Sequence, residues 1–443
     1  MSDREERQSW HYQLSDYEAA QVRDVLEQHD HLSAWLILSR FGNGFVREAA
    51  LRALVAQPSA EALEALLERL NDWVPQVRQQ AAVAVEAYLL PARAELLLQA
   101  LAPLLALADK QRVDHGQTLA RARGVLLAPE VRPQVLAAFV GARGKVARWL
   151  LALLLESTRE PLALLALALA HDEVTVRQRA VDACAELLPA EARPLLEQAM
   201  QTCGASVRVK ALRLLWPLLD DPRPALRAAL LDRSAALRCL ARWAAPQVGL
   251  DSREVLLKRL AEPLPRTKDA WLGLVGLARE LKAAEADAML REALGSASLQ
   301  VRVQALEALG ERGLVEQIAA LDDPADKVFA CALRLLRQQA LTDYRDAVEQ
   351  RLDQHWHELP EPRRQALLSC KPGWRQLQYL LRRHDQAPAE AAHWLEQLNR
   401  WCAWQFSLQV PKGQEPQREA LLLRVQQMEE AGQLPSGSAK RLR

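Results

Sequence analysis

A short motif, Val-Arg-x-x-Ala, recurs along the chain and constrains its fold more than any other feature of the sequence. Successive copies lie 31, 99, 31, 30, 64 and 27 residues apart, and the two long intervals divide into three units of 33 residues and two of 32. This period is typical of repeat proteins, so about ten repeated units, from roughly residue 30 to residue 340, replace the three globular domains that a length of 443 residues would suggest. Complete copies begin at Val46, Val77, Val176, Val207 and Val301, weaker copies begin at Leu237 and Val328, and the weakest lie near Val113, Val146 and Asp269.

Apolar residues within each copy follow helical spacing. In the first copy they are Val46, Ala50, Leu51 and Leu54, which share one face of an α-helix and not one face of a strand. Another helical segment precedes most copies, and a short break separates the two segments. We therefore predict that each unit is a helical hairpin that buries its apolar face against the next unit.

The composition also favours helices. Leu, Ala and Val dominate the apolar residues, whereas the chain has only two Ile, six Thr, five Phe and five Tyr. Strands favour β-branched and aromatic residues, and the 17 glycines supply little material for hairpin turns. The prediction is an all-α protein, a right-handed α-solenoid of about ten hairpins with a helical C-terminal region.

The repeated units resemble HEAT repeats, in particular the short HEAT-like repeats of phycobilin lyases and their relatives. The resemblance implies that the second helix of each hairpin lines a concave face, but it does not indicate an activity. In that family an Asp before this helix often pairs with an Arg near its start. The spacing is kept at Asp72 with Arg78 and at Asp232 with Arg238. It is not kept at Arg47, Arg177, Arg208 and Arg302, where Phe41, His171, Thr202 and Ser296 stand six residues earlier.

The two ends of the chain differ from the middle. We predict an acidic N-terminal capping helix within residues 1–32, because Ser15 and Glu18 form a capping box that opens a helix reaching about Gln28. The repeats are expected over residues 33–342 and a Trp-rich helical region over residues 343–432. A flexible basic tail is expected over residues 433–443.

Two sets of basic residues are candidate binding sites. On the concave face, a positive stripe would accept a phosphate backbone or an acidic protein segment, although each arginine could instead pair locally or cap a carbonyl. Its candidates are Arg47, Arg78, Arg143, Lys145, Arg148, Arg177, Arg208 and Arg302. Residues 363–383 carry six basic residues, no acidic residue and two aromatic rings, a pattern that suits nucleic acid or else pairs with the acidic stretch before it. These candidates are Arg363, Arg364, Lys371, Trp374, Arg375, Tyr379, Arg382 and Arg383.

Trp394, Trp401 and Trp404 share one helix face with Gln397. This stripe either seals the end of the repeats or binds a partner, and we favour sealing.

No catalytic residue, metal site or cofactor is expected. His355 and His357 are two residues apart and point to different sides of a helix, and no phosphate-binding loop or nucleophile elbow occurs. Six dispersed cysteines and an N-terminus without an apolar leader favour a cytoplasmic protein with no membrane partner.

The predicted function is that of a non-enzymatic scaffold or adaptor that binds a protein partner along its concave face. The alternative is a nucleic-acid binder, including a HEAT-like DNA glycosylase. A net charge of +1 excludes only a uniformly basic surface, because acidic and basic segments cancel. The oligomeric state stays open.

Overall fold

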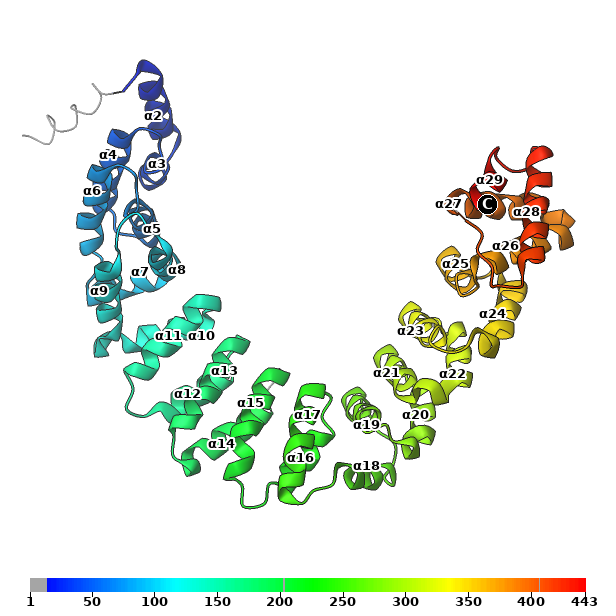
Figure 1. Ribbon diagram of the computed structural model, residues 1–443. Helices are drawn as coiled ribbons and strands as arrows, with labels where there is room; N and C mark the ends of the chain where they lie inside the picture. The colour runs from blue at the N-terminus through cyan, green and yellow to red at the C-terminus, as the bar shows by residue number, and fades with distance from the viewer. Residues whose placement is uncertain (1–13, 202–203, 406) are drawn as a thin grey trace, which may run out of the picture. The chain divides into compact units, whose positions relative to one another are not determined.

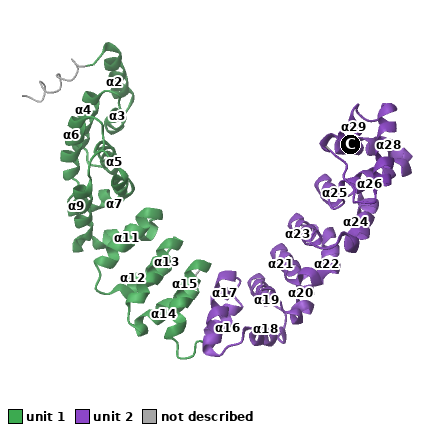
Figure 2. Cartoon of the chain, in the orientation of Figure 1, with its two compact units in different colours: residues 1–222 green, residues 223–443 purple. Residues whose placement is uncertain are grey.

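The computed structural model describes residues 14–201, 204–405 and 407–443, and within these ranges all regular secondary structure is helical, with no strand. The all-α prediction is therefore confirmed. The chain forms two compact units, residues 1–222 and residues 223–443 (Figure 2). The division falls inside the region that the sequence assigns to repeats.

Unit 1 is built from short helices connected by tight turns. Its helices are α2 (Asp16–Gln28), α3 (His31–Leu38), α4 (Gly44–Val55), α5 (Ala60–Arg69), α6 (Pro75–Glu86), α7 (Ala94–Gln99), α8 (Leu101–Ala106), α9 (Gly116–Leu127), α10 (Arg132–Gly141), α11 (Gly144–Glu156), α12 (Pro161–Leu169), α13 (Val174–Ala183), α14 (Pro189–Met200) and α15 (Ala205–Leu215).

Unit 2 continues in the same manner and ends with longer helices. Its helices are α16 (Arg223–Leu230), α17 (Ala235–Ala244), α18 (Ser252–Leu260), α19 (Lys268–Glu280), α20 (Asp287–Leu294), α21 (Leu299–Leu309), α22 (Leu314–Ala319), α23 (Asp326–Leu336), α24 (Leu341–His355), α25 (Glu361–Leu368), α26 (Gly373–Gln386), α27 (Ala391–Trp404), α28 (Glu415–Glu430) and α29 (Ser438–Leu442).

The repeated motif lies on helices, as its spacing predicts. The complete copies fall on α4, α6, α13, α15 and α21, and the weaker copies at Leu237 and Val328 fall on α17 and α23. In the first copy Val46, Ala50, Leu51 and Leu54 are all buried. Full burial of a Val or Leu side chain contributes about 1.5–3 kcal/mol, so this face is what attaches each helix to its neighbours.

The helices of unit 1 pack as successive pairs. α3 packs on α4, α5 on α6, α10 on α11, α12 on α13 and α14 on α15. Figure 1 shows α11, α13 and α15 side by side in one row, with α12 and α14 side by side in a second row, and direct contacts link the neighbours in each row. One apolar core extends through these pairs from Leu51 to Leu215.

The N-terminal helix α2 has the predicted capping box. Ser15 and Glu18 each bond the backbone amide of the other, at 3.3 and 2.9 Å, and the helix ends at Gln28 as expected. The start of the predicted capping region, residues 1–13, lies outside the described residues.

In unit 2, α16 packs on α17, α20 on α21 and α22 on α23, while α19, α21 and α23 form a row. Residues 272–278 of α19 are all buried. Two of them are Gly273 and Gly276, where a Cβ atom would overlap the Leu231 carbonyl oxygen and the Arg238 guanidinium. The absence of a side chain at these positions lets α19 approach its neighbours closely.

The C-terminal residues differ from the predicted flexible tail. Residues Ser438–Leu442 form α29, which packs on α27 and α28. Leu442 is fully buried, its carbonyl oxygen accepts a 2.8 Å hydrogen bond from the Leu408 amide, and Glu429 accepts hydrogen bonds from the Gly437 and Ala439 amides. Leu434, Ala439 and Leu442 all join the apolar core of unit 2, so buried side chains and hydrogen bonds together fix this segment.

Among the described residues, no single helix has the length and apolar composition that a membrane crossing requires; one sharply bent pair, residues 91–99 with 101–109, satisfies that test by length and composition alone.

Candidate binding site

The arginine of the repeated motif bonds the backbone at the start of its own hairpin turn. In five copies an Nη1–H group donates to the carbonyl oxygen six residues earlier. The distances are 2.9 Å from Arg47 to Phe41, 2.8 Å from Arg78 to Asp72, 2.5 Å from Arg177 to His171, 2.7 Å from Arg238 to Asp232 and 2.8 Å from Arg302 to Ser296. Any residue type supplies this carbonyl, so the missing Asp at some copies does not break the contact.

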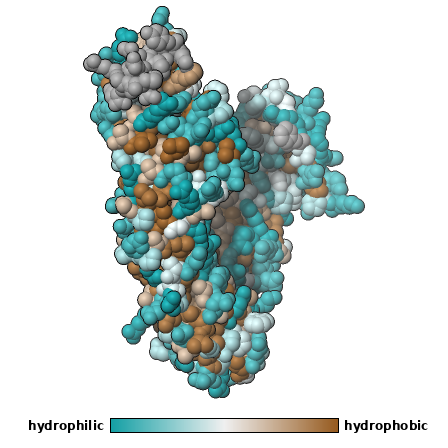
Figure 3. Space-filling view, turned by 90° about the vertical axis from the view of Figure 1, so that its left-hand side faces the viewer, coloured by the Kyte–Doolittle hydropathy of each residue, from teal (hydrophilic) through white to brown (hydrophobic). Residues whose placement is uncertain are grey.

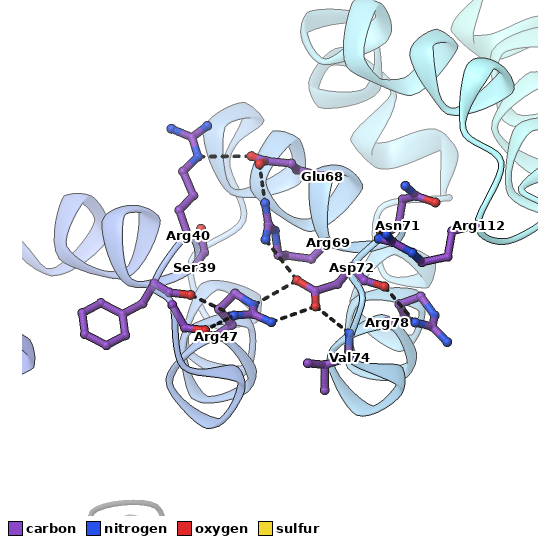
Figure 4. A network of polar contacts seen from close by, with 12 residues as sticks. Ser39, Arg40, Arg47, Glu68, Arg69, Asn71, Asp72, Val74, Arg78 and Arg112 are labelled. Atoms are coloured by element: carbon purple, nitrogen blue, oxygen red, sulfur yellow. Dashed lines mark hydrogen bonds and ion pairs between the residues drawn. The ribbon is translucent and has the colours of Figure 1, made fainter. Parts of the chain in front are cut away.

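Three of these arginines also pair with an acid farther along the chain. Arg47 binds both carboxylate oxygens of Asp72 at 2.9 Å, as Figure 4 shows, and Arg302 binds Asp323 in the same bidentate way. Arg238 binds Glu280 at 2.6 Å. The expected side-chain pair of Asp72 with Arg78 is therefore wrong, because the Asp72 carboxylate pairs with the preceding repeat.

Asp72 is the centre of a buried network. Its carboxylate also accepts hydrogen bonds from Arg69 at 3.0 Å and from the Val74 amide at 2.9 Å (Figure 4). Burial alone would raise the pKa of the Asp72 carboxyl, but the hydrogen bonds from Arg47 and Val74 and the nearby positive charges lower it below its ordinary value. The ionised carboxylate stabilises the junction between the first two repeats.

The predicted concave stripe is mostly not available to a partner. Arg47 and Arg208 are buried, whereas Arg78, Arg148, Arg177 and Arg302 are half-buried. Arg143 and Lys145 are exposed, and Lys145 pairs with Asp109 at 3.0 Å. The arginines that enter a helix junction contact carbonyls or acids of the protein there, because a buried guanidinium must be paired. Among the described residues, Arg143 and Arg148 have no such side-chain partner.

Exposed charges also pair between neighbouring hairpins. Lys210 of α15 binds Asp182 of α13 at 2.6 Å, and in unit 2 Glu307 of α21 receives both Arg279 of α19 and Arg334 of α23 at 2.6 Å. Each exposed pair is worth only about 0–1 kcal/mol. They link neighbouring helices of a row. Figure 3 shows apolar residues scattered among hydrophilic ones on the face of unit 1 turned to the viewer.

The basic segment at residues 363–383 pairs with acids, as the alternative interpretation expects. Arg363 binds Asp326 at 2.7 Å and Lys371 binds Glu349 at 2.8 Å. Arg382 and Arg383 both bind Asp353, at 3.1 and 3.4 Å, and Arg364 donates to the Trp356 carbonyl. Lys371 is only 4% exposed, so this lysine has no free surface for a phosphate group.

The aromatic residues of this segment cannot stack on a nucleobase, because Trp374 and Tyr379 are buried. Their ring faces are covered by cations: Arg375 lies 4.9 Å from the Trp374 centroid, and Lys371 lies 5.3 Å from that of Tyr379. Burial is the main reason that the pKa of Tyr379 is raised. The segment that the sequence presents as a nucleic-acid patch is thus part of the core of unit 2.

His355 and His357 each lie beside a glutamate. His355 lies 2.8 Å from Glu358, and His357 lies 3.1 Å from Glu390. Among the described residues, no three His, Cys, Asp or Glu side chains are grouped so that they could hold a metal ion.

The tryptophan stripe of α27 divides into two parts. Trp394 is fully buried against Trp356, with ring centroids 4.7 Å apart, and Trp401 is 8% exposed. Trp404, at the end of the helix, is 80% exposed. The first two seal the core of unit 2, whereas the third presents its ring to the surroundings.

A pocket of about 350 Å³ opens beside Trp404, between α25, α26 and α27. Its apolar lining residues include Leu368, Leu380 and Trp401, and its charged lining residues are Glu361 and Arg400, which lie 2.8 Å apart. Arg400 also binds Glu396 at 2.6 Å, so two carboxylates share this one cation.

Four glutamines line the pocket and provide its polar groups: Gln365, Gln376, Gln397 and Gln405. The Gln376 amide is fixed, since its oxygen accepts from the Trp401 indole at 2.9 Å and its nitrogen donates to the Lys371 carbonyl at 2.6 Å. Gln397 is 7% exposed, and its side chain makes no hydrogen bond with the residues that the structure describes. The pocket therefore contains an amide with unused donors and an unused acceptor.

Sequence reasoning identified Trp401, Trp404 and Gln397 by their shared helix face but did not identify Gln365, Gln376 and Gln405. The signal available in the sequence was the high proportion of glutamine between residues 365 and 405, which is ordinary for helix surfaces.

No protein-family model matches this chain, and a search of curated protein sequences finds no significant match.

Proposed function

We propose that this chain is a HEAT-repeat protein, a right-handed α-solenoid of about ten hairpins, and that it is a non-enzymatic scaffold that binds a protein partner on its concave face and at the α25–α27 pocket. The successive helix pairs and the one-sided rows of second helices support the architecture. The residues around the pocket support a protein as the partner.

The observation that carries the proposal is the environment of Trp404. An indole that is 80% exposed stands beside a recess lined by amides and apolar side chains, and the charges at its edge are paired. Exposed aromatic residues beside a partly apolar recess are typical of the centre of protein interfaces, where such residues contribute much of the binding energy.

The pairing of the basic residues favours a protein over a nucleic acid. Affinity for nucleic acid comes mainly from cations that are free to replace counterions. In the segment 363–383, Arg363, Lys371, Arg382 and Arg383 contact acids of this same chain. A phosphate backbone would have to compete with those carboxylates.

The test is photocrosslinking of the full chain with benzoylphenylalanine in place of Trp404, in extracts of the cells that make the protein. We expect a discrete protein adduct that survives nuclease treatment and added salt. Binding to DNA or RNA probes that falls steeply with salt, together with no protein adduct, would instead establish the nucleic-acid alternative.

A further inference from the structure

Two histidines and two tryptophans meet where the end of α24 contacts the start of α27. Trp356 and His357 follow α24 directly, and His393 and Trp394 lie in the first turn of α27. The Trp356 indole is 1% exposed and its centroid lies 4.7 Å from that of Trp394, whereas His393 is half-buried. This corner therefore joins a buried aromatic core to a histidine that is partly open to solvent.

The ring of His393 is held in its neutral form by the hydrogen bond that it accepts. The Nε1–H group of Trp356 donates to Nε2 of His393 at 2.8 Å, so this nitrogen carries the lone pair and the ring hydrogen is on Nδ1. It is the hydrogen bond that satisfies the Trp356 indole among the described residues. A proton added to Nε2 turns the acceptor into a donor, and two N–H groups would then face each other.

The surrounding cations oppose that proton. The ring centroid of His357 lies 5.3 Å from that of His393, and Arg364 of α25 lies over the Trp356 ring at 5.4 Å. Arg383 of α26 lies over the other indole, 4.8 Å from its centroid. Burial lowers the pKa of His393 below its ordinary value, and the positive charges of His357 and Arg364 lower it further.

Two glutamates act in the opposite direction. Glu390 directly precedes α27, and its carboxylate is already occupied by His357 at 3.1 Å and by an indole of α27. Glu396 is exposed, lies one turn after His393 on α27 and pairs with Arg400 at 2.6 Å. Both negative charges partly offset the lowering of the pKa of His393. A protonated ring therefore gains by leaving the buried indole and turning toward solvent and Glu396.

We infer that His393 is a pH-dependent switch at the contact between the end of α24 and α27. At neutral pH its Nε2 atom binds the indole of Trp356. In acid the imidazolium turns toward solvent and Glu396 and leaves that indole without its hydrogen bond. The pair of His357 with Glu390 is kept when His357 is protonated, so the corner opens at one contact and stays closed at the other. This inference does not depend on the scaffold proposal.

The switch also predicts how stability changes with pH. Because the pKa of His393 is lower in the folded than in the unfolded protein, its contribution is fully present above the unfolded value of about 6.5. The contribution is lost as the pH falls from there through the folded pKa, and the unfolding equilibrium constant rises by up to about tenfold per pH unit in that window. In His393→Gln this part of the decline should be absent, because the glutamine oxygen accepts the same hydrogen bond and does not titrate.

The experiment follows the indole N–H signals of the full chain, labelled with isotopically enriched tryptophan, by NMR from about pH 8 to about pH 5, the range in which a histidine titrates. Trp356→Phe identifies the Trp356 signal by its disappearance. We expect this signal to move in wild type with a midpoint below about pH 6.5 and to stay in place in His393→Gln.

His355→Gln is the matched control. His355 pairs with Glu358 at 2.8 Å, and its ring contacts neither indole in the part of the chain that the structure describes, so the Trp356 signal should titrate as in wild type. His357→Gln should move the midpoint to higher pH, since it removes a neighbouring positive charge.

A Trp356 signal that is constant with pH in wild type, or that moves equally in His393→Gln, would overturn the inference. Urea unfolding decides the question if Trp356→Phe does not fold and the signal stays unassigned. A free energy of unfolding that falls equally in wild type and His393→Gln between about pH 7 and about pH 5 would also overturn it.

Discussion

The guanidinium of Arg238 lies in the space that a side chain at Gly276 would occupy. Arg238 belongs to α17 and Gly276 to α19, and the same guanidinium reaches Glu280 one turn farther along α19. The glycine and the glutamate thus act together: one leaves room for the cation, and the other pairs with it.

Substitution of alanine at Gly273 or Gly276 should destabilise unit 2. Gly276→Ala displaces Arg238 from Glu280, and Gly273→Ala overlaps the Leu231 backbone, which cannot move aside. We expect a loss of about 1–3 kcal/mol for Gly276→Ala, as for other overpacked cores, and a larger loss for Gly273→Ala. Urea unfolding followed by circular dichroism measures both.

Gly124 is the matched control for these two substitutions. It lies inside α9, and nothing stands within 4 Å of the position of its missing Cβ atom. Gly124→Ala should therefore stabilise the protein by up to about 1 kcal/mol through helix propensity alone. Stabilisation by Gly276→Ala to the same extent would show that Arg238 moves away freely.

Removal of the Asp72 carboxylate should be among the most damaging single changes in unit 1. Asp72→Ala leaves Arg47 buried without its counter-charge, and breaking a buried pair in this way costs about 3–5 kcal/mol. The exposed pair of Arg52 with Glu48 is the control, since Arg52→Ala should change the free energy of unfolding by about 0.5 kcal/mol or less. If both variants had a similarly small effect on the free energy of unfolding in urea, the Asp72 network would not stabilise unit 1 as predicted.

The same carboxylate predicts a dependence of stability on pH. Because the pKa of Asp72 is lower in the folded than in the unfolded protein, its contribution is fully present above the unfolded value of about 3.9. That contribution is lost as the pH falls from there through the folded pKa. In Asp72→Asn, the decline of the urea midpoint below about pH 4 should be shallower than in wild type. Parallel curves would show that other carboxylates cause the decline.

Leu442 should hold the C-terminal helix in place. Leu442→Ala removes a fully buried side chain that contacts the core of unit 2, and such truncations cost about 2–5 kcal/mol. Lys440→Ala alters the exposed side of the same helix and should have little effect. Protease cleavage near the C-terminus would measure the difference, and wild-type resistance in Leu442→Ala would show that the other contacts of α29, including the buried Ala439, are enough to hold it.

The basic segment should behave as core and not as a ligand site. Lys371→Met leaves Glu349 without its closest cation, so we expect a lower unfolding temperature. Any affinity for a single-stranded DNA probe should be unchanged. A variant with wild-type stability but reduced DNA affinity would reverse this assignment.

The repeated helices could be predicted because their apolar positions follow the helical period, and each such face had to be buried. The N-terminal cap could be predicted for the same local reason, since Ser15 and Glu18 are three residues apart. Both signals lie within a single segment of the chain.

The partners of the cations could not be predicted in this way. Arg47 binds a carbonyl, which every residue has, and a carboxylate 25 residues farther along. Whether Lys371 faces solvent or Glu349 depends on how α24 meets the following helices. The pocket posed the same difficulty, because Gln365, Gln376 and Gln397 come from three different helices.

The bond from each motif arginine to the carbonyl six residues earlier has a consequence for how such a chain can change. A contact that uses the main chain as acceptor places no demand on the side chain at that position, which here is Phe41, Asp72, His171 or Ser296. Substitutions at this position of the turn therefore leave the hydrogen bond from the arginine intact. Hairpins closed in this way keep the same internal contact while their exposed residues are free to differ.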